Sequence, residues 1–149
     1  MYYFGYGMNT NPQGMAGRCP DAQALGRARL PDHEFRFSYH ADIVPAPGQY
    51  VEGVLWRVTD QCMARLDVLE SYPHYYTRKE VQVQCGGDTF TAWVYQMNLL
   101  EDGLPSDPGM PDMGYLQNVM EGYIAFGCDR DQIYRALNEA QEYQHFYQI

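Results

Sequence analysis

The chain is short of basic residues: its 149 residues include 10 Lys and Arg against 19 Asp and Glu, which gives a formal net charge of −9. A protein with this charge is repelled by nucleic acid and by anionic membrane surfaces. Arg27 and Arg29 stand close together, but one such pair does not offset the total. We therefore expect no nucleic acid and no membrane among the partners, while the oligomeric state is left open.

The sequence also lacks long apolar runs. No stretch approaches the roughly 20 apolar residues that a membrane span needs, and the apolar start at Met1 is too short for a signal peptide. The expected location is therefore the cytoplasm. With 46% hydrophobic and 19% charged residues, the protein is expected to form a single globular domain over residues 1–149.

Closely spaced metal ligands are missing as well. Zinc sites normally take their ligands in close pairs, whereas the cysteines and the histidines of this sequence are scattered. We expect no metal site, and we predict buried, inert thiols at all four cysteines: Cys19, Cys62, Cys85 and Cys128. No P-loop occurs, and Gly5-x-Gly7 lacks the rest of a dinucleotide-binding fingerprint.

Alternating apolar residues, separated by Gly and Pro, predict antiparallel β structure with helices at its edges. Strands are expected at 1–6, 24–30, 34–40, 41–44, 50–58, 75–85 and 89–97, with a hairpin turn at 86–88. A short helix or a turn is expected at 12–19, and helices are expected after Thr59, at 112–126 and at 129–143, with a break at Gly127. Residues 101–112, rich in Gly and Pro, form a loop that can cover a site.

The first strand halts at a sequence that turns the backbone sharply. Gly7 can leave its N–H open to a ligand, and Asn9 tolerates left-handed conformations. Such a turn either forms an anion-binding nest of N–H groups or is an ordinary connection from strand to helix. Taken alone, residues 1–10 favour the ordinary connection.

Glu70 continues the apolar face of the helix that Thr59 caps. Met63, Leu66, Leu69 and Glu70 follow at spacings of three and four, so they share one side. Burial of a carboxyl raises its pKa and makes it a better general base near neutral pH. The alternative is a solvated residue in the last helical turn. The side on which Asp67 lies is less certain.

Several segments, in this order, resemble the gamma-glutamylcyclotransferase (AIG2-like) family. The turn Tyr6-Gly7-Met8-Asn9 is similar to the family's Tyr-Gly-Ser-Asn. The other matching segments, which extend to about Gly127, are Arg18-Cys19-Pro20, Gly26 to Leu30, Gly53-Val54-Leu55, Asp67 to Glu70, Tyr76 and Tyr115. The resemblance implies an α+β fold, a small mixed, mainly antiparallel β-barrel with peripheral helices. It also implies a cavity between the first turn and Glu70.

The resemblance implies release of 5-oxoproline and an amine from a gamma-glutamyl amide, with Glu70 as general acid and base and without metal or organic cofactor. Backbone N–H groups of Gly7, Met8 and Asn9 would bind the substrate, flanked by Tyr6 and Thr10, while Tyr76 and Tyr115 would orient the glutamyl moiety. Met8 stands in place of the family's serine, and Ser71 where glycine is common. Met8 removes a hydroxyl and leaves the N–H groups available.

Three other interpretations remain open. The same chemistry can act on another donor, such as a gamma-glutamyl-amine, in which case the amine half would contact the loop around 103–111. A second interpretation is a non-catalytic protein that holds a small molecule in the same cavity. The third, an acidic mimic that binds a basic partner, rests on the net charge of −9 alone.

Overall fold

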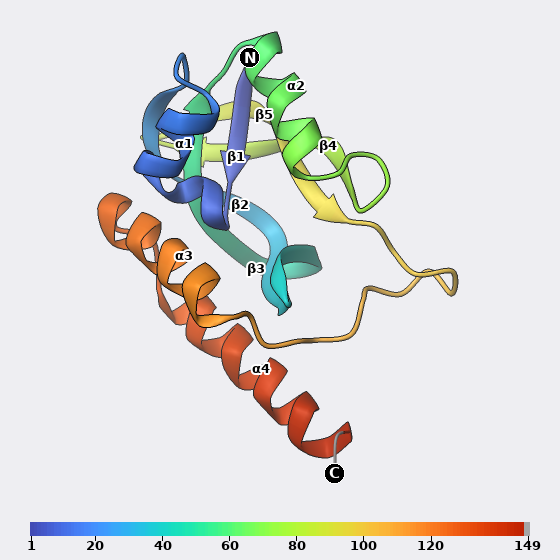
Figure 1. The fold of residues 1–149 in the computed structure, drawn as a ribbon. Coiled ribbons are helices and arrows are strands. Elements are labelled where there is room, and N and C mark those ends of the chain that lie inside the picture. The colour runs from blue at the N-terminus through green and yellow to red at the C-terminus, as the bar shows by residue number, and fades with distance from the viewer. Residues whose placement is uncertain (148–149) are drawn as a thin grey trace.

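A computed structural model describes residues 1–147, and its centre is a closed barrel of five strands (Figure 1). The strands are β1 (Tyr2–Gly5), β2 (Gln23–Ser38), β3 (His40–Arg57), β4 (Tyr76–Cys85) and β5 (Asp88–Met97). They follow one another around the barrel in the order β1-β3-β2-β4-β5. Every neighbouring pair is antiparallel except β1 and β5, whose parallel contact closes the barrel. The predicted α+β fold, a mixed and mainly antiparallel barrel, is confirmed.

Four α-helices and a short 3-10 helix surround the barrel. They are η1 (Met8–Thr10), α1 (Pro12–Arg18), α2 (Asp60–Leu69), α3 (Met113–Phe126) and α4 (Asp131–Tyr147). The side chains of Asn11, Thr59 and Asp112 cap α1, α2 and α3 by accepting hydrogen bonds from backbone N–H groups of the first turn. Gly127 ends α3 in the left-handed conformation with φ 69°, which explains the predicted break. Among the described residues, no helix has both the length and the apolar character to cross a membrane.

The second and third strands are longer than the sequence indicates. The sequence predicts separate strands at 24–30 and 34–40 around Pro31-Asp32, and likewise at 41–44 and 50–58. The structure instead has one two-stranded ribbon, in which the register shifts between Pro31 and His33. Asp32 takes φ 59° there, and its carboxylate accepts a hydrogen bond from the N–H of Gly48 at 3.0 Å. The extra residues lie on β3 and form a bulge between Tyr50 and Pro45, so the pairing of β2 with β3 continues past Pro31.

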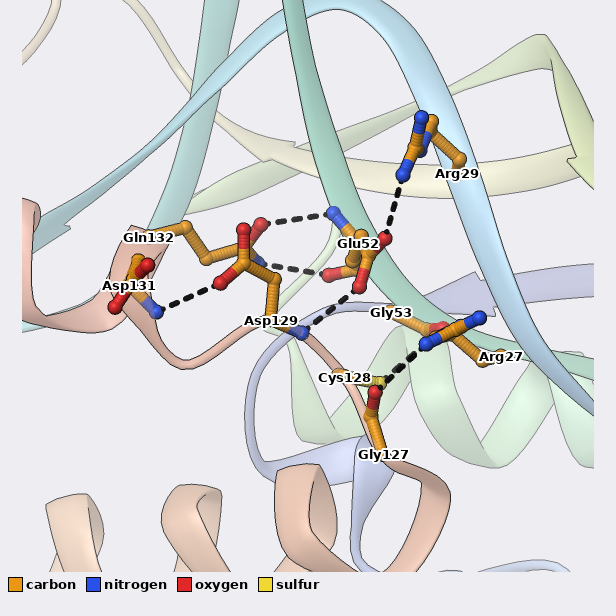
Figure 2. A network of polar contacts seen from close by, with 9 residues as sticks. All are labelled: Arg27, Arg29, Glu52, Gly53, Gly127, Cys128, Asp129, Asp131 and Gln132. Atoms are coloured by element: carbon orange, nitrogen blue, oxygen red, sulfur yellow. Dashed lines mark hydrogen bonds and ion pairs between the residues drawn. The ribbon is translucent and has the colours of Figure 1, made fainter.

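A polar network attaches the start of α4 to β3 (Figure 2). The Glu52 side chain, 5% exposed, accepts hydrogen bonds from Arg29 at 3.0 Å and from the N–H of Asp129 at 2.8 Å. The amide of Gln132 bonds both the N–H and the C=O of Glu52 and also donates to the Tyr123 hydroxyl at 2.8 Å. That hydroxyl donates to the C=O of Tyr6 at 2.6 Å. The network therefore reaches from α4 to the end of the first strand.

The prediction of buried, inert thiols at all four cysteines is wrong for Cys19 and Cys62, which are bonded to each other, and Cys85 is only half-buried. Cys19, at the end of α1, forms a disulfide with Cys62 of α2, and their Cα atoms are 5.2 Å apart. Because 43 residues separate the two cysteines, their pairing depends on how α1 and α2 pack and is not readable from spacing. Cys128 is a buried thiol whose pKa burial raises to about 12, and Cys85 is a half-buried one.

Candidate active site

A cavity of about 250 Å³ opens where the end of α2 faces the first turn of the protein. Its walls come from β1 and the following turn, the start of β3, the segment after α2, the entrance to β4, β5 and α3. Its lining residues are Tyr3, Tyr6, Gly7, Met8, Asn9, His40, Ala41, Leu69, Glu70, Ser71, Tyr75, Tyr76, Tyr95 and Tyr115. The structure thus brings together six of the seven predicted binding residues with the predicted acid.

Glu70 lies at the C-terminal cap of α2, where its own N–H donates to the C=O of Leu66 at 2.9 Å. The residue is half-buried and lines the cavity, and its carboxyl group is largely shielded from solvent. Burial raises the pKa of Glu70 to about 7, against a weaker lowering by the positive charge of Arg18. At neutral pH this carboxyl is therefore poised both to accept and to donate a proton.

The turn after β1 lines the cavity with Gly7, Met8 and Asn9. Within the turn, the first backbone hydrogen bond comes from the N–H of Thr10, which donates to the C=O of Gly7 at 3.1 Å. The N–H groups of Gly7, Met8 and Asn9 come before this residue and donate no backbone hydrogen bond within the turn. A Cβ at Gly7 would lie 2.9 Å from the Cβ of Ala41 and 3.2 Å from the Tyr115 hydroxyl. Glycine is needed here because β3 and α3 approach the turn so closely.

The side chain of Asn9 is used to hold the turn in place. It is 2% exposed, its amide donates to the Tyr3 hydroxyl at 2.9 Å, and its amide oxygen accepts from Arg18 at 3.0 Å. The indole N–H of Trp56 donates to the backbone C=O of Asn9 at 2.9 Å. Asn9 thus leaves its backbone N–H, rather than its side chain, as the group that can meet a ligand.

Thr10 does not line the cavity. Its side chain is fully buried, and its hydroxyl donates to the C=O of Gly7 at 2.7 Å. Thr10 therefore supports the turn from behind. Met8 does line the cavity, and its sulfur lies 3.8 Å from the Arg18 guanidinium.

Tyr76 and Tyr115 meet at the backbone of Ala41. The Tyr76 hydroxyl donates to the C=O of Ala41 at 2.8 Å, and the Tyr115 hydroxyl accepts from the N–H of Ala41 at 2.9 Å. Burial raises the pKa of both hydroxyls, so both are neutral at physiological pH. The proton of Tyr115 therefore remains available for a further hydrogen bond, whereas the Tyr76 proton is already used in the hydrogen bond to Ala41 and the Tyr76 oxygen keeps its lone pairs as acceptors.

Several wall residues were not predicted from the sequence. Ala41 acts through its backbone and so has no informative side chain. His40 packs edge-to-face on Tyr115, with ring centroids 5.0 Å apart. Tyr3, Tyr75 and Tyr95 are among 14 tyrosines in the sequence, which does not indicate which of them reach a cavity. Tyr6 donates its hydroxyl to the C=O of Tyr95 at 2.6 Å, across the closure of the barrel.

Two other expectations can be placed. Asp67 lies outside the cavity lining, where it accepts from the Tyr95 hydroxyl at 2.6 Å and pairs with Arg78 at 3.4 Å. The loop at 101–112 contributes no residue to the lining. It is instead tied to the turn between β2 and β3, where Gly109 bridges to Ser38 and its C=O accepts from the N–H of Tyr39 at 2.9 Å. Residues 1–147 contain no cluster of three or more His, Cys, Asp or Glu able to hold a metal ion.

Comparison with known proteins gives consistent matches. A sequence model described as "Gamma-glutamyl cyclotransferase, AIG2-like" matches residues 3–115. The gamma-glutamylcyclotransferase family protein YtfP of Escherichia coli K12 is 29% identical over 105 residues, which cover 70% of this protein and 88% of YtfP. The match to the putative gamma-glutamylcyclotransferase CG2811 of Drosophila melanogaster is 30% identical but spans 59 residues, which are 39% of this protein and 38% of that one.

Solved structures share the fold over most of this protein. A structure titled "Gamma-glutamyl cyclotransferase" superposes with a TM-score of 0.72 at 26% identity, covering 85% of this protein and 80% of the other. YkqA of Bacillus subtilis superposes with a TM-score of 0.74 at 22% identity. That superposition covers 93% of this protein and 54% of YkqA, so the likeness concerns the fold of about half of that protein.

Proposed function

This chain belongs to the gamma-glutamyl cyclotransferase, AIG2-like family, and we propose that it releases 5-oxoproline and a free amine or amino acid from a gamma-glutamyl amide. The observation that carries the proposal is the place of Glu70 in a tyrosine-lined cavity opposite the first turn, where burial raises the pKa of its carboxyl to about 7. Family and fold support a cyclotransferase-like activity. The reaction and the residue roles that follow are inferred from the geometry of the cavity.

The protein does not have to supply a nucleophile for this reaction, because the nucleophile is part of the substrate. The α-amine attacks the side-chain amide carbonyl of the same glutamyl residue and forms a five-membered lactam. Holding the substrate in the ring-forming conformation therefore supplies a large part of the rate enhancement. What remains is to remove a proton from the attacking nitrogen and to protonate the leaving nitrogen, which is otherwise a poor leaving group.

Glu70 is proposed to perform both proton transfers. Starting from the neutral α-amine, the nitrogen bonds to the carbonyl carbon while Glu70, as carboxylate, takes one of its protons. The tetrahedral intermediate then collapses, the original amide C–N bond breaks, and Glu70 returns that proton to the departing nitrogen. The enzyme ends in its starting protonation state, and a pKa of about 7 suits both steps at neutral pH.

The two tyrosines complement opposite ends of the amino-acid portion of the substrate. Tyr115 has a free hydroxyl proton, which suits the α-carboxylate, whereas the Tyr76 oxygen keeps lone pairs, which suit the N–H groups of the α-amine. Gly7, Met8 and Asn9 line the same cavity, and their N–H groups would stabilise the substrate carboxylate or the oxyanion of the intermediate. Tyr6 would then shape the wall of the cavity, since its own hydroxyl is bonded to Tyr95.

The test is 5-oxoproline release from gamma-glutamyl-alanine by wild-type protein and by Glu70→Gln. The variant keeps the shape and removes the base, so turnover should fall by about 10³-fold or more while the protein stays folded. Glu80→Gln, at an exposed carboxylate outside the cavity, is the control and should keep full turnover. Equal turnover by Glu70→Gln would refute the proposed role of Glu70. If the wild-type protein binds the dipeptide without releasing alanine, it is a binding protein.

A further inference from the structure

Asp42 is a buried carboxylate directly beside the residue that holds both tyrosine hydroxyls. It follows Ala41 in β3, is 1% exposed, and does not line the cavity. Its Oδ1 accepts a hydrogen bond from the N–H of Met97 at 2.9 Å. Asp42 therefore acts on the framework around the cavity rather than on a ligand.

The contacts of Asp42 form a closed ring with Tyr76. Met97, at the end of β5, pairs in the β4–β5 ladder with Tyr76, at the start of β4. Tyr76 in turn donates its hydroxyl to the C=O of Ala41 at 2.8 Å, and Ala41 is bonded covalently to Asp42. The Asp42 carboxylate thus fixes β3 against the point where Tyr76 enters the barrel, and Tyr115 binds to the same Ala41 peptide.

The direct partner of this carboxylate is the backbone rather than a cation. Asp42 forms no ion pair within 4 Å among residues 1–147, although Arg36 is its partner across the β2–β3 ladder and Lys79 is also near. Burial raises the pKa of Asp42 to about 6, a shift that the backbone amides of Met97 and Ile43 oppose, and more weakly the charges of Arg36 and Lys79. Removing the side chain would leave the amide of Met97, itself 3% exposed, without its acceptor.

We propose that Asp42 is a positioning residue for the cyclisation. It holds the Ala41 peptide where that peptide orients the Tyr76 oxygen and the Tyr115 proton toward the glutamyl moiety. The inference rests on the proposed function for the identity of the ligand, gamma-glutamyl-alanine. Its structural part, the link from Asp42 through Ala41 to Tyr76, is independent of turnover.

The test is a double-mutant cycle between Asp42→Ala and Tyr76→Phe, made in the Glu70→Gln background so that bound ligand is not consumed. Calorimetry measures the dissociation constant of gamma-glutamyl-alanine for each member of the cycle. If Asp42 acts through Tyr76, Asp42→Ala weakens binding about tenfold when the Tyr76 hydroxyl is present, and by less than about threefold when it is absent. A parallel cycle with native Glu70 should show the same coupling in kcat/KM.

A matched control is provided by Glu52. It is also a buried carboxylate that accepts a backbone N–H, from Asp129 at 2.8 Å, and it does not line the cavity (Figure 2). Its side chain takes no part in the hydrogen bonds from Gln132 through Tyr123 to Tyr6. Glu52→Ala should lower stability, leave the dissociation constant within about threefold, and combine additively with Tyr76→Phe.

The conservative variant Asp42→Asn keeps an oxygen that can accept from Met97, so it should bind within about threefold of the parent protein. If Asp42→Ala does not fold, the dissociation constant of Asp42→Asn is the measurement that tests the proposal. Additive effects in the cycle, or a tenfold loss in Asp42→Asn, would overturn the proposal. If the cycle shows coupling in binding but the protein with native Glu70 does not turn over the dipeptide, the cyclotransferase function is refuted and the positioning role of Asp42 is retained. Absence of any binding would overturn both.

Discussion

The raised pKa of Glu70 predicts that replacing this residue makes the protein more stable at neutral and alkaline pH. The pKa rises from 4.5 in the unfolded reference to about 7 in the folded protein, because the carboxyl is buried. The folded state therefore binds the Glu70 proton more tightly than the unfolded state does. Between these two values stability falls as pH rises, because ionising the buried carboxyl costs free energy.

The size of this effect follows from the shift. A difference of about 2.5 in pKa, at about 1.4 kcal/mol for each pKa unit, gives at most about 3.5 kcal/mol. The amide of Glu70→Gln resembles the protonated acid and does not ionise. The variant should therefore match the wild type near pH 4.5, gain steadily between pH 4.5 and 7, and exceed it by up to about 3.5 kcal/mol at pH 8.

The assay is urea unfolding of both proteins at a series of pH values, with the difference in unfolding free energy plotted against pH. Other groups that titrate in this window, such as Asp42, are common to the two proteins and cancel in the difference. A difference that stays near zero from pH 4.5 to 8 would mean that Glu70 ionises as freely as in water. The reasoning from a sheltered carboxyl would then be refuted.

The remaining predictions concern the tyrosines, the turn and the disulfide. Tyr115→Phe removes the donor proposed for the α-carboxylate, so the KM for gamma-glutamyl-alanine should rise about tenfold in steady-state assays, whereas an unchanged KM would contradict that role. Gly7→Ala places a Cβ 2.9 Å from that of Ala41, so stability should fall by about 1–3 kcal/mol in urea unfolding. Gly17→Ala, whose Cβ meets nothing within 4 Å, should not be destabilised in this way. Removing the Cys19–Cys62 disulfide by Cys62→Ser should cost up to about 4 kcal/mol, given a loop of 43 residues, and added reductant should weaken the wild type alone.

The sequence predicts those parts of the site that depend on local patterning. The spacing of Met63 and Leu66, which are both buried, indicates the core-facing side of α2, because a helix repeats every 3.6 residues. Leu69, by contrast, lies at the cavity and is 39% exposed. The turn at Gly7 is likewise local. In both cases a few neighbouring residues determine the backbone, so the pattern is visible in the sequence itself.

Features that depend on distant contacts could not be predicted. Ala41 anchors two tyrosines through its peptide group, and no residue type indicates such a role. Thr10 belongs to the characteristic turn, yet it faces away from the cavity because its hydroxyl closes the turn on Gly7. The pairing of Cys19 with Cys62 and the continuation of β2 past Pro31 both follow from packing between segments far apart in sequence.

The central claim is that a sheltered Glu70 carboxyl faces a site for the glutamyl moiety. Its most direct test is a carbon-13 NMR titration of the Glu70 carboxyl carbon, assigned by its loss in Glu70→Gln, without and with 5-oxoproline. We predict a midpoint near pH 7 in the free protein that moves when 5-oxoproline binds. A midpoint near the ordinary value of 4.5 that 5-oxoproline leaves unchanged would contradict the account.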